Sequence, residues 1–351
     1  MDLQQVARII GIGSGGVLAL LLVLSFVGAL YQTLGIVGDA RKYPPPGKRV
    51  DVGGYRLHVS SSGEGSPTVV MDSGMCHVSP IWGLVQPEVA RFTCACSYDR
   101  AGYAWSDPGP GPRTSQQIAR ELHTLLITAA IPGPYVLVGH SFGGLNMCTY
   151  AGMYPDEVAG MVLVDALSTH IAMHNPTEFR YFLAASRRKF RFLSIMNRLG
   201  LVRLFLWLRG VDAALDFVRK LPSEIAPLVP AGSLRKTLDA AAAECAWMAE
   251  SIGSAAVTDR LHLPIDLPLV VLSHGIPDMF TGNLLSGEAE QAEQIWQQMQ
   301  AALVGLSSQG KLLIAAKSGH KIHIDQPELV VDAIRQVVEA VRKNLKGGAS
   351  R

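Results

Sequence analysis

The chain has 351 residues, 48% of them hydrophobic and 17% charged, a composition too apolar for a disordered protein and sufficient for a large core. Lysine and arginine total 31 against 29 acidic residues, a formal charge of +2, so no overall charge attracts a polyanion and nucleic acid is not an expected partner. The five cysteines lack the paired spacing of a zinc site or a disulfide framework, which predicts free thiols.

The N-terminal segment has the length and composition of a membrane anchor. Residues 9–30 carry no charge, and a helix of this length, at about 1.5 Å per residue, crosses a hydrocarbon layer of roughly 30 Å. A cleaved signal peptide is the alternative, because Val27 and Ala29 suit a cleavage site, but the apolar run exceeds the usual length. We therefore predict a single-pass membrane protein with a tail over 1–8 and an anchor over 9–30.

Basic residues follow this span closely: Arg41, Lys42, Lys48 and Arg49. The positive-inside rule then favours a cytosolic catalytic domain. We predict a Pro-rich linker over 31–48, stiffened by the prolines within Tyr43–Lys48, that holds the domain a short distance from the bilayer.

Past the linker, strand-like and helix-like segments alternate. Residues 50–61 alternate apolar and polar side chains around Gly53-Gly54, which indicates a β-hairpin. Short continuous apolar runs, typical of strands buried on both faces, follow at 68–71, 94–98, 135–139, 161–164, 268–273 and 311–316. Residues 114–130 and 328–341 have helical spacing. This order predicts an α/β fold, a mostly parallel sheet with helices on both faces and ligands at the carboxyl ends of the strands.

A long helical insertion interrupts the strand pattern. Residues 168–267 separate two core strands and read mainly as helix, so we predict a helical cap there, a core over 49–167 and 268–345, and a C-terminal tail over 346–351. Residues 180–209 are basic and aromatic without an acidic side chain. Such helices lie on anionic membrane surfaces or simply present a solvated outer face, and both interpretations stay open.

The strongest chemical signal is Gly139-His140-Ser141-Phe142-Gly143, which fits G-x-S-x-G directly after an apolar strand. Small glycines permit the sharp strand-to-helix turn that lifts a serine hydroxyl into a cleft. We therefore predict Ser141 as a nucleophile and His140 as a packing residue.

A serine nucleophile needs a base, and His320 follows the last strand at the same sheet edge. His323 is the neighbour to weigh against it, and loop packing explains that residue better because no metal-ligand set accompanies it. Asp325 begins a capping-box pattern with Glu328, so we predict that it caps the final helix.

The base needs a carboxylate that orients the imidazole. Asp278, after strand 268–273, gives the chain order Ser, Asp, His, and Asp165, after strand 161–164, is the alternative acid. We prefer Asp278. The oxyanion donors are expected to be the amide of Phe142, which follows the nucleophile, and the amide of Met75, in the loop after strand 68–71.

Together these residues resemble the α/β-hydrolase superfamily, in particular its cap-bearing esterases, lipases and carbon–carbon bond hydrolases, over roughly residues 50–345. Tyr98 to Tyr103 with Trp105 to Pro108 looks like the family's D-x-R-G-x-G-x-S segment, and Ser318-Gly319-His320 looks like its histidine loop. The resemblance supports Ser141, His320 and the Phe142 and Met75 amides. Ser73-Gly74 departs from the family's His-Gly, and serine at the elbow argues against dehalogenase and epoxide-hydrolase chemistry, which uses aspartate there.

The chemistry predicted is hydrolysis of a carboxylic ester or related acyl bond through an acyl-serine intermediate, with neither a metal nor an organic cofactor. The expected partners are a membrane and a small, apolar or lipid-like acyl ester. One alternative is acyl transfer on the same residues, since His320 and Asp325 have H-x-x-x-x-D spacing. The other is a non-catalytic ligand receptor or scaffold on the same fold.

Overall fold

The computed structural model describes residues 3–168, 176–258, 266–278 and 286–348. Its centre is an eight-stranded sheet of order β1-β2-β4-β3-β5-β6-β7-β8. The strands are β1 Lys48–Asp51, β2 Arg56–Ser62, β3 Thr68–Asp72, β4 Ala95–Asp99, β5 Tyr135–His140, β6 Val158–Val164, β7 Leu269–His274 and β8 Gly310–Ala315. β1, β2 and β4 pair antiparallel, and every other pair is parallel. The predicted mostly parallel sheet is confirmed.

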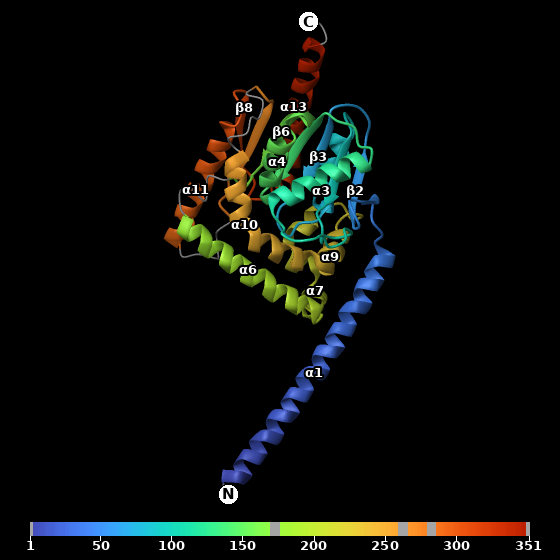
Figure 1. Ribbon diagram of the computed structural model, residues 1–351, viewed down its shortest axis with the longest axis vertical. Coiled ribbons are helices and arrows are strands. Elements are labelled where there is room, and N and C mark those ends of the chain that lie inside the picture. Colours follow the sequence, from blue (N-terminus) through green and yellow to red (C-terminus); the bar gives the residue numbers. More distant parts are fainter. Residues whose placement is uncertain (1–2, 169–175, 259–265, 279–285, 349–351) are drawn as a thin grey trace.

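Helices cover both faces of this sheet (Figure 1). The core elements around it are η1 Ser79–Trp82, α2 Gln86–Val89, α3 Ser115–Thr128, α4 Phe142–Met153, η2 Pro155–Glu157, α11 Ser286–Val304, α12 Ile322–Asp325 and α13 Pro327–Gly348. Along β3, Val69 and Met71 pack on the side of α2 and α13, whereas Val70 packs on the side of α3 and α4. Successive strand residues point to opposite faces, so a run that is apolar throughout fills two core layers.

The insertion between β6 and β7 folds as helices at one end of the sheet. They are α6 Pro176–Arg198, α7 Leu201–Arg209, α8 Val211–Ala214, η3 Asp216–Lys220, α9 Leu228–Gly232, η4 Ser233–Thr237 and α10 Leu238–Thr258. α10 packs against α6 on one side and against α3 and α4 on the other. α10 therefore joins these cap helices to the core.

The N-terminal helix α1 spans Leu3–Lys42 and leaves the body of the protein as a single rod (Figure 1). Within it, Ser14–Lys42 is long and apolar enough to cross a membrane, and only 6% of its most apolar window is buried. The expectation of a linker beginning at residue 31 is wrong, because the helix continues to Lys42. The prolines that follow end the helix, since a proline disfavours helical backbone in the residue before it.

The turns of α1 beyond residue 30 are bonded to the cap. Gln32, only 4% exposed, donates to Asn197 Oδ1 at 3.0 Å and to the Leu234 carbonyl at 2.8 Å. Arg203 donates to Asp39 at 2.7 Å. These contacts fix the end of α1 directly on the cap, and residues 43–47 alone join α1 to β1, so the connection is shorter than the predicted linker.

Candidate active site

Ser141 lies on a strained turn between β5 and α4. Its φ of 54° and ψ of −121° are outside the regions that ordinary residues occupy, and the hydroxyl, in the described structure, makes no capping bond to α4. A side chain at Gly139 would meet the backbone of Gly144 at 2.5 Å, and one at Gly143 would meet the Asp72 carbonyl at 2.5 Å. Because the glycines leave no side chain there, the strand can turn into the helix and present the serine at the carboxyl edge of the sheet.

The loop between β8 and α12 carries His320 to the same edge. Its Nδ1 lies 2.6 Å from Oδ2 of Asp165, which is fully buried, while the imidazole remains 15% exposed. The His320 backbone is tied to the elbow, because the His140 Nε2–H donates to the His320 carbonyl at 2.9 Å. An ionised carboxylate only accepts hydrogen bonds, so the proton of a neutral His320 is on Nδ1 and Nε2 is the basic nitrogen.

The structure separates the two candidate acids. Asp165 contacts the His320 ring, whereas Asp278 Oδ1 accepts the backbone N–H of His320 at 2.8 Å and lies against Gly319. The preference for Asp278 therefore needs correction: its carboxylate is engaged with the loop backbone, and the alternative acid makes the ring contact. Asp165 directly follows β6 with a φ of 45°.

A second histidine contacts the same carboxylate. His274 ends β7, and its Nδ1 lies 2.7 Å from Asp165 Oδ2 while its Nε2 lies 2.9 Å from Glu293 Oε1. Burial lowers the pKa of His274, but its hydrogen bonds and charge interactions with the two carboxylates outweigh this and raise that pKa to about 9. His274 is therefore a cation at neutral pH that donates from both ring nitrogens.

Asp165 is consequently held as an anion. Its other oxygen accepts from Trp296 Nε1 at 3.0 Å and from the His274 backbone at 3.2 Å. Burial raises the pKa of Asp165, but hydrogen bonds from His274 and His320 reverse this and leave the pKa well below its usual range. A chain of contacts thus runs from Glu293 through His274 and Asp165 to His320.

Asp165, His274 and His320 also form a group whose ligand atoms lie within 4.8 Å of one another. Both Nδ1 atoms point at one carboxylate oxygen at 2.6 and 2.7 Å, the distances of charge-assisted hydrogen bonds. A metal ion would instead take each nitrogen at about 2.0–2.1 Å from itself. Hydrogen bonding accounts for the arrangement of these three side chains.

Further histidines pack beneath the site. His140 lies between His320 and His323, with ring centroids 4.7 and 4.4 Å away, and His77 follows at 5.8 Å. Burial and mutual repulsion hold the pKa of His140 and of His323 well below the usual value, and they lower that of His77 to about 3. These rings are neutral packing groups, as the sequence suggested for His140 and His323, and their neutrality allows close contact.

The expected oxyanion donors lie on two adjoining segments. Phe142 begins α4, and Met75 belongs to the loop after β3, which lies against Gly143 through the Asp72 and Ser73 carbonyls. Arg100 holds this loop by donating to Asp72 at 2.7 Å and to the Ser73 carbonyl at 2.6 Å. A buried guanidinium thereby fixes the backbone that carries the Met75 amide.

The same arginine connects the core to the cap. Arg100 Nε donates to Glu244 Oε1 of α10 at 2.7 Å, and the Tyr103 hydroxyl donates to the other oxygen at 2.5 Å. Burial lowers the pKa of Arg100, and the charges of Asp72 and Glu244 more than reverse this, so the ion pair stays charged. The position of α10 and the shape of the loop after β3 are therefore coupled.

Asp325 was expected to cap the final helix, and this expectation is wrong. It lies at the end of α12, where its carboxylate accepts from Lys220 of the cap at 2.5 Å and from the Ser318 hydroxyl at 3.3 Å. The helix α13 begins two residues later at Pro327. Asp325 thus links the histidine loop to the cap segment η3.

Comparison with known proteins identifies the family. A model described as the alpha/beta hydrolase family matches residues 69–333, which include the elbow and the histidine loop. The chain belongs to the alpha/beta hydrolase family. The resemblance inferred from the sequence and the predicted fold are both confirmed by this match.

The proteins to which the chain is similar in sequence differ in length. The chain is 26% identical to the probable transporter efuK of Hormonema carpetanum over 83% of this chain, and it covers 42% of that protein. It is 26% identical to the protein YqjL of Bacillus subtilis, also over 83% of this chain, and it covers 91% of that protein. The chain therefore spans less than half of one relative and nearly all of the other.

Among solved structures, a malate-bound thermophilic esterase from Thermogutta terrifontis superposes with a TM-score of 0.60 at 20% identity. The match covers 84% of this chain and 98% of that one. At this identity the likeness shows the fold of an alpha/beta hydrolase and not the chemistry.

Sequence reasoning missed part of the polar network. His274 was included in no motif, although it is the last residue of a buried strand at the carboxyl edge of the sheet. Glu293 and Trp296 lie three residues apart on α11, where Glu293 contacts the His274 ring and Trp296 donates to Asp165. The position of His274 at a strand end could have indicated a site residue. The helical pattern of α11 does not distinguish Glu293 or Trp296 from its other residues.

Proposed function

We propose that this alpha/beta hydrolase is a serine hydrolase that cleaves a carboxylic ester or related acyl bond through an acyl-Ser141 intermediate. The observation that carries the proposal is the 2.6 Å contact between His320 and the buried Asp165, made in a loop that is bonded to the elbow residue beside Ser141. A strained serine and a carboxylate-oriented imidazole on neighbouring loops are the groups that nucleophilic acyl transfer to an enzyme requires.

In the acylation step His320 Nε2 takes the proton of the Ser141 hydroxyl while Oγ bonds to the acyl carbon. The amides of Phe142 and Met75 donate to the resulting oxyanion. Collapse of the tetrahedral intermediate breaks the ester bond, and the leaving alkoxide takes the proton from His320. Asp165 stabilises the imidazolium formed between these two transfers.

Deacylation repeats the sequence with water as the nucleophile. His320 takes a proton from the water, whose oxygen attacks the acyl carbon, and then returns a proton to Ser141 Oγ as the acid product leaves. Acyl transfer to an alcohol remains a weaker candidate, because the Asp325 of its expected H-x-x-x-x-D pair is bonded to Lys220 and Ser318.

We further propose that α1 anchors the enzyme in a membrane, with the catalytic domain on the cytosolic side, and that the substrate is apolar or lipid-like. The exposed apolar surface of α1 and the basic residues Arg41 and Lys42 in its last turn support this.

Hydrolysis by the purified full-length chain tests the proposal. A panel of p-nitrophenyl esters of increasing acyl length is offered to the wild type, to Ser141→Ala and to Ser62→Ala, a control on the exposed part of β2. We expect Ser141→Ala to lose at least about 10⁴-fold in kcat and Ser62→Ala to match the wild type. Wild-type turnover that persists in Ser141→Ala would remove Ser141 as the nucleophile.

A further inference from the structure

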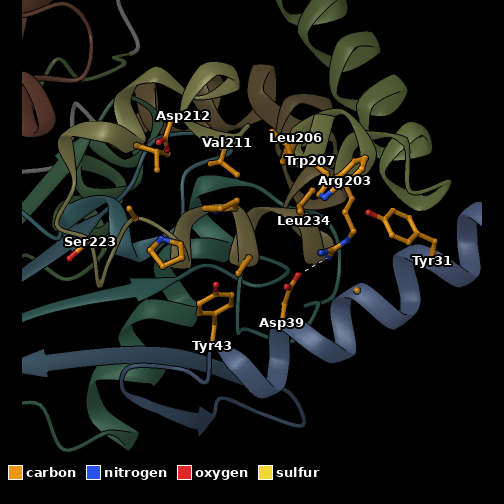
Figure 2. A pocket seen from close by; sticks show the side chains of 16 residues that line it. Tyr31, Asp39, Tyr43, Arg203, Leu206, Trp207, Val211, Asp212, Ser223 and Leu234 are labelled. Carbon is orange, nitrogen blue, oxygen red and sulfur yellow. Dashed lines mark hydrogen bonds and ion pairs between the residues drawn. The ribbon is translucent and has the colours of Figure 1, made fainter. Parts of the chain in front are cut away.

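A cavity of about 660 Å³ lies where α1 meets the cap (Figure 2), and its lining does not include Ser141. Tyr31 and Asp39 line it from α1, and Leu206 and Trp207 line it from α7. Its remaining walls come from Tyr43 and from the cap segments between residues 211 and 234. The volume is within the roughly 300–1,000 Å³ of pockets that hold small organic ligands.

The lining is mainly apolar, with charge at one wall. Arg203 lies flat against the Gly35 backbone of α1, where it pairs with Asp39 at 2.7 Å and donates to Gln32 at 3.0 Å. Leu206 and Leu234 are buried beside this pair. A ligand that fits must therefore be apolar along most of its length, and any polar end is best placed next to the Arg203–Asp39 pair.

The cavity is continuous with surfaces suited to a bilayer. The apolar side chains of α1 that precede it are exposed, with Phe26 71% and Leu34 62% accessible. On α7, Trp207 is 74% and Leu208 66% accessible. Tyrosine and tryptophan side chains favour the membrane–water interface, and both Tyr31 and Trp207 line the cavity. A helix α1 in the bilayer would bring the cavity to that interface.

The short segment η3 touches both the cavity and the histidines that pack beneath the catalytic site. Val218 lines the cavity, while the adjacent Phe217 contacts the His77 ring, 6.0 Å between centroids, and lies under Lys321, the residue after His320. His77 in turn packs on His140 of the elbow. An occupant of the cavity would therefore press on a segment that touches the catalytic loops.

We propose that this cavity binds the acyl chain of a single-chain lipid taken from the membrane, and so defines a long-chain acyl ester as the substrate class. The inference rests on the proposed function, since the bound chain would belong to a substrate or product of that active site. The apolar lining, the exposed apolar approach along α1 and α7, and the proximity of η3 to the histidine loop carry it.

Photolabelling tests the binding directly. The full-length chain in phosphatidylcholine nanodiscs is irradiated with palmitic acid carrying a terminal diazirine, and labelled peptides are mapped by mass spectrometry. Ala226→Trp and Ser223→Trp each add bulk at a lining residue, and Ala213→Trp adds the same bulk on the exposed face of α8. Ser223 is exposed, so its variant avoids disturbing the core should Ala226→Trp fold poorly.

We expect label on α7–α8 in the wild type and in Ala213→Trp, and at least a five-fold loss in the two lining variants. Label that is unchanged in the folded lining variants, or confined to residues 14–30 of α1, would overturn the proposal. The lipid would then be contacting the anchor and not the cavity.

Ester hydrolysis separates this inference from the proposed function. We expect Ala226→Trp to lower kcat/KM for p-nitrophenyl palmitate at least ten-fold while leaving p-nitrophenyl acetate within two-fold, with Ala213→Trp changing neither. Equal palmitate turnover in every variant would overturn the cavity's role and leave the serine mechanism standing. Failure of the wild type to hydrolyse either ester would defeat the proposed function and the substrate assignment with it.

Discussion

Exchange of the two candidate acids for asparagine distinguishes their roles. Asp165→Asn replaces a carboxylate whose Oδ2 accepts from both His320 and His274. An amide has one oxygen, which accepts, and one NH₂ group, which donates. If the oxygen faces the two histidine rings, the NH₂ group faces the N–H donors of Trp296 and of the His274 backbone, which is unfavourable. If the NH₂ group turns to His320, the ring proton moves to Nε2 and the nitrogen facing the serine is no longer basic.

The two substitutions should differ greatly in magnitude. Loss of the orienting carboxylate in a serine triad lowers kcat about 10⁴-fold, which corresponds to about 5 kcal/mol of transition-state stabilisation. Asp278→Asn keeps an oxygen that accepts the His320 backbone N–H and only weakens that 2.8 Å bond. A change of about 0.5–1.5 kcal/mol, roughly ten-fold in rate or less, is expected there.

The assay is kcat for a short p-nitrophenyl ester, measured on variants whose thermal unfolding matches the wild type. We expect Asp165→Asn to be nearly inactive and Asp278→Asn to retain most of its activity. A thousand-fold loss in Asp278→Asn with an active Asp165→Asn would refute the reasoning and return the role of acid to Asp278.

Four further predictions concern the charges around the site. His274→Asn removes a cation that donates to Asp165 Oδ2, so the carboxylate is held less firmly against His320 and kcat for a short ester should fall. An unchanged kcat would show that His274 only packs. The raised pKa of His274 contributes stability that is complete below pH 6.5 and lost as pH rises through about 9, so the melting temperature should fall across that interval in the wild type and less in the variant. Glu244→Gln removes one of the two carboxylates that pair with the buried Arg100, leaving Asp72, and should destabilise the fold by about 3 kcal/mol, read as a lower urea midpoint; an unchanged midpoint would contradict the cap tether. Burial holds the pKa of His140 and His323 below the unfolded value, so stability is present above pH 6.5 and should fall below it by up to about 1.4 kcal/mol per pH unit for each histidine; a flat melting temperature between pH 6.5 and 5 would argue against two buried neutral rings.

The sheet could be predicted because its pattern is local. Val69, Val70 and Met71 are consecutive apolar residues, and in a strand with both faces covered each of them reaches a core layer. The glycines on both sides of Ser141 likewise carry a local steric requirement that can be read from five residues. Strand positions and the elbow therefore follow from short segments alone.

The choice of acid could not be predicted in the same way. Asp165 and Asp278 both follow parallel strands that end at one edge of the sheet, so topology places them equally near His320. What separates them is loop geometry: Asp165 comes directly after β6, whereas Asp278 comes four residues after β7 and meets the loop backbone at Gly319 and His320. Such differences depend on tertiary contacts.

The length of α1 escaped prediction for a related reason. The apolar run ends near residue 30, and the turns beyond it contain Gln32 and Asp39, which as a sequence resemble a linker. These two side chains find Asn197 and Arg203 of the cap, about 165 positions away, and those bonds hold the helix to Lys42. No local pattern announces partners at that separation.

The most direct test of the account is covalent labelling of the nucleophile. The full-length chain is treated with a fluorophosphonate, which reacts with activated serine hydroxyls, and the modified residue is located by peptide mass spectrometry in the wild type and in His320→Ala. We expect stoichiometric label on Ser141 in the wild type and a strong reduction in His320→Ala. A folded wild type without label on Ser141, or equal labelling without His320, would contradict the claim that this imidazole activates that serine.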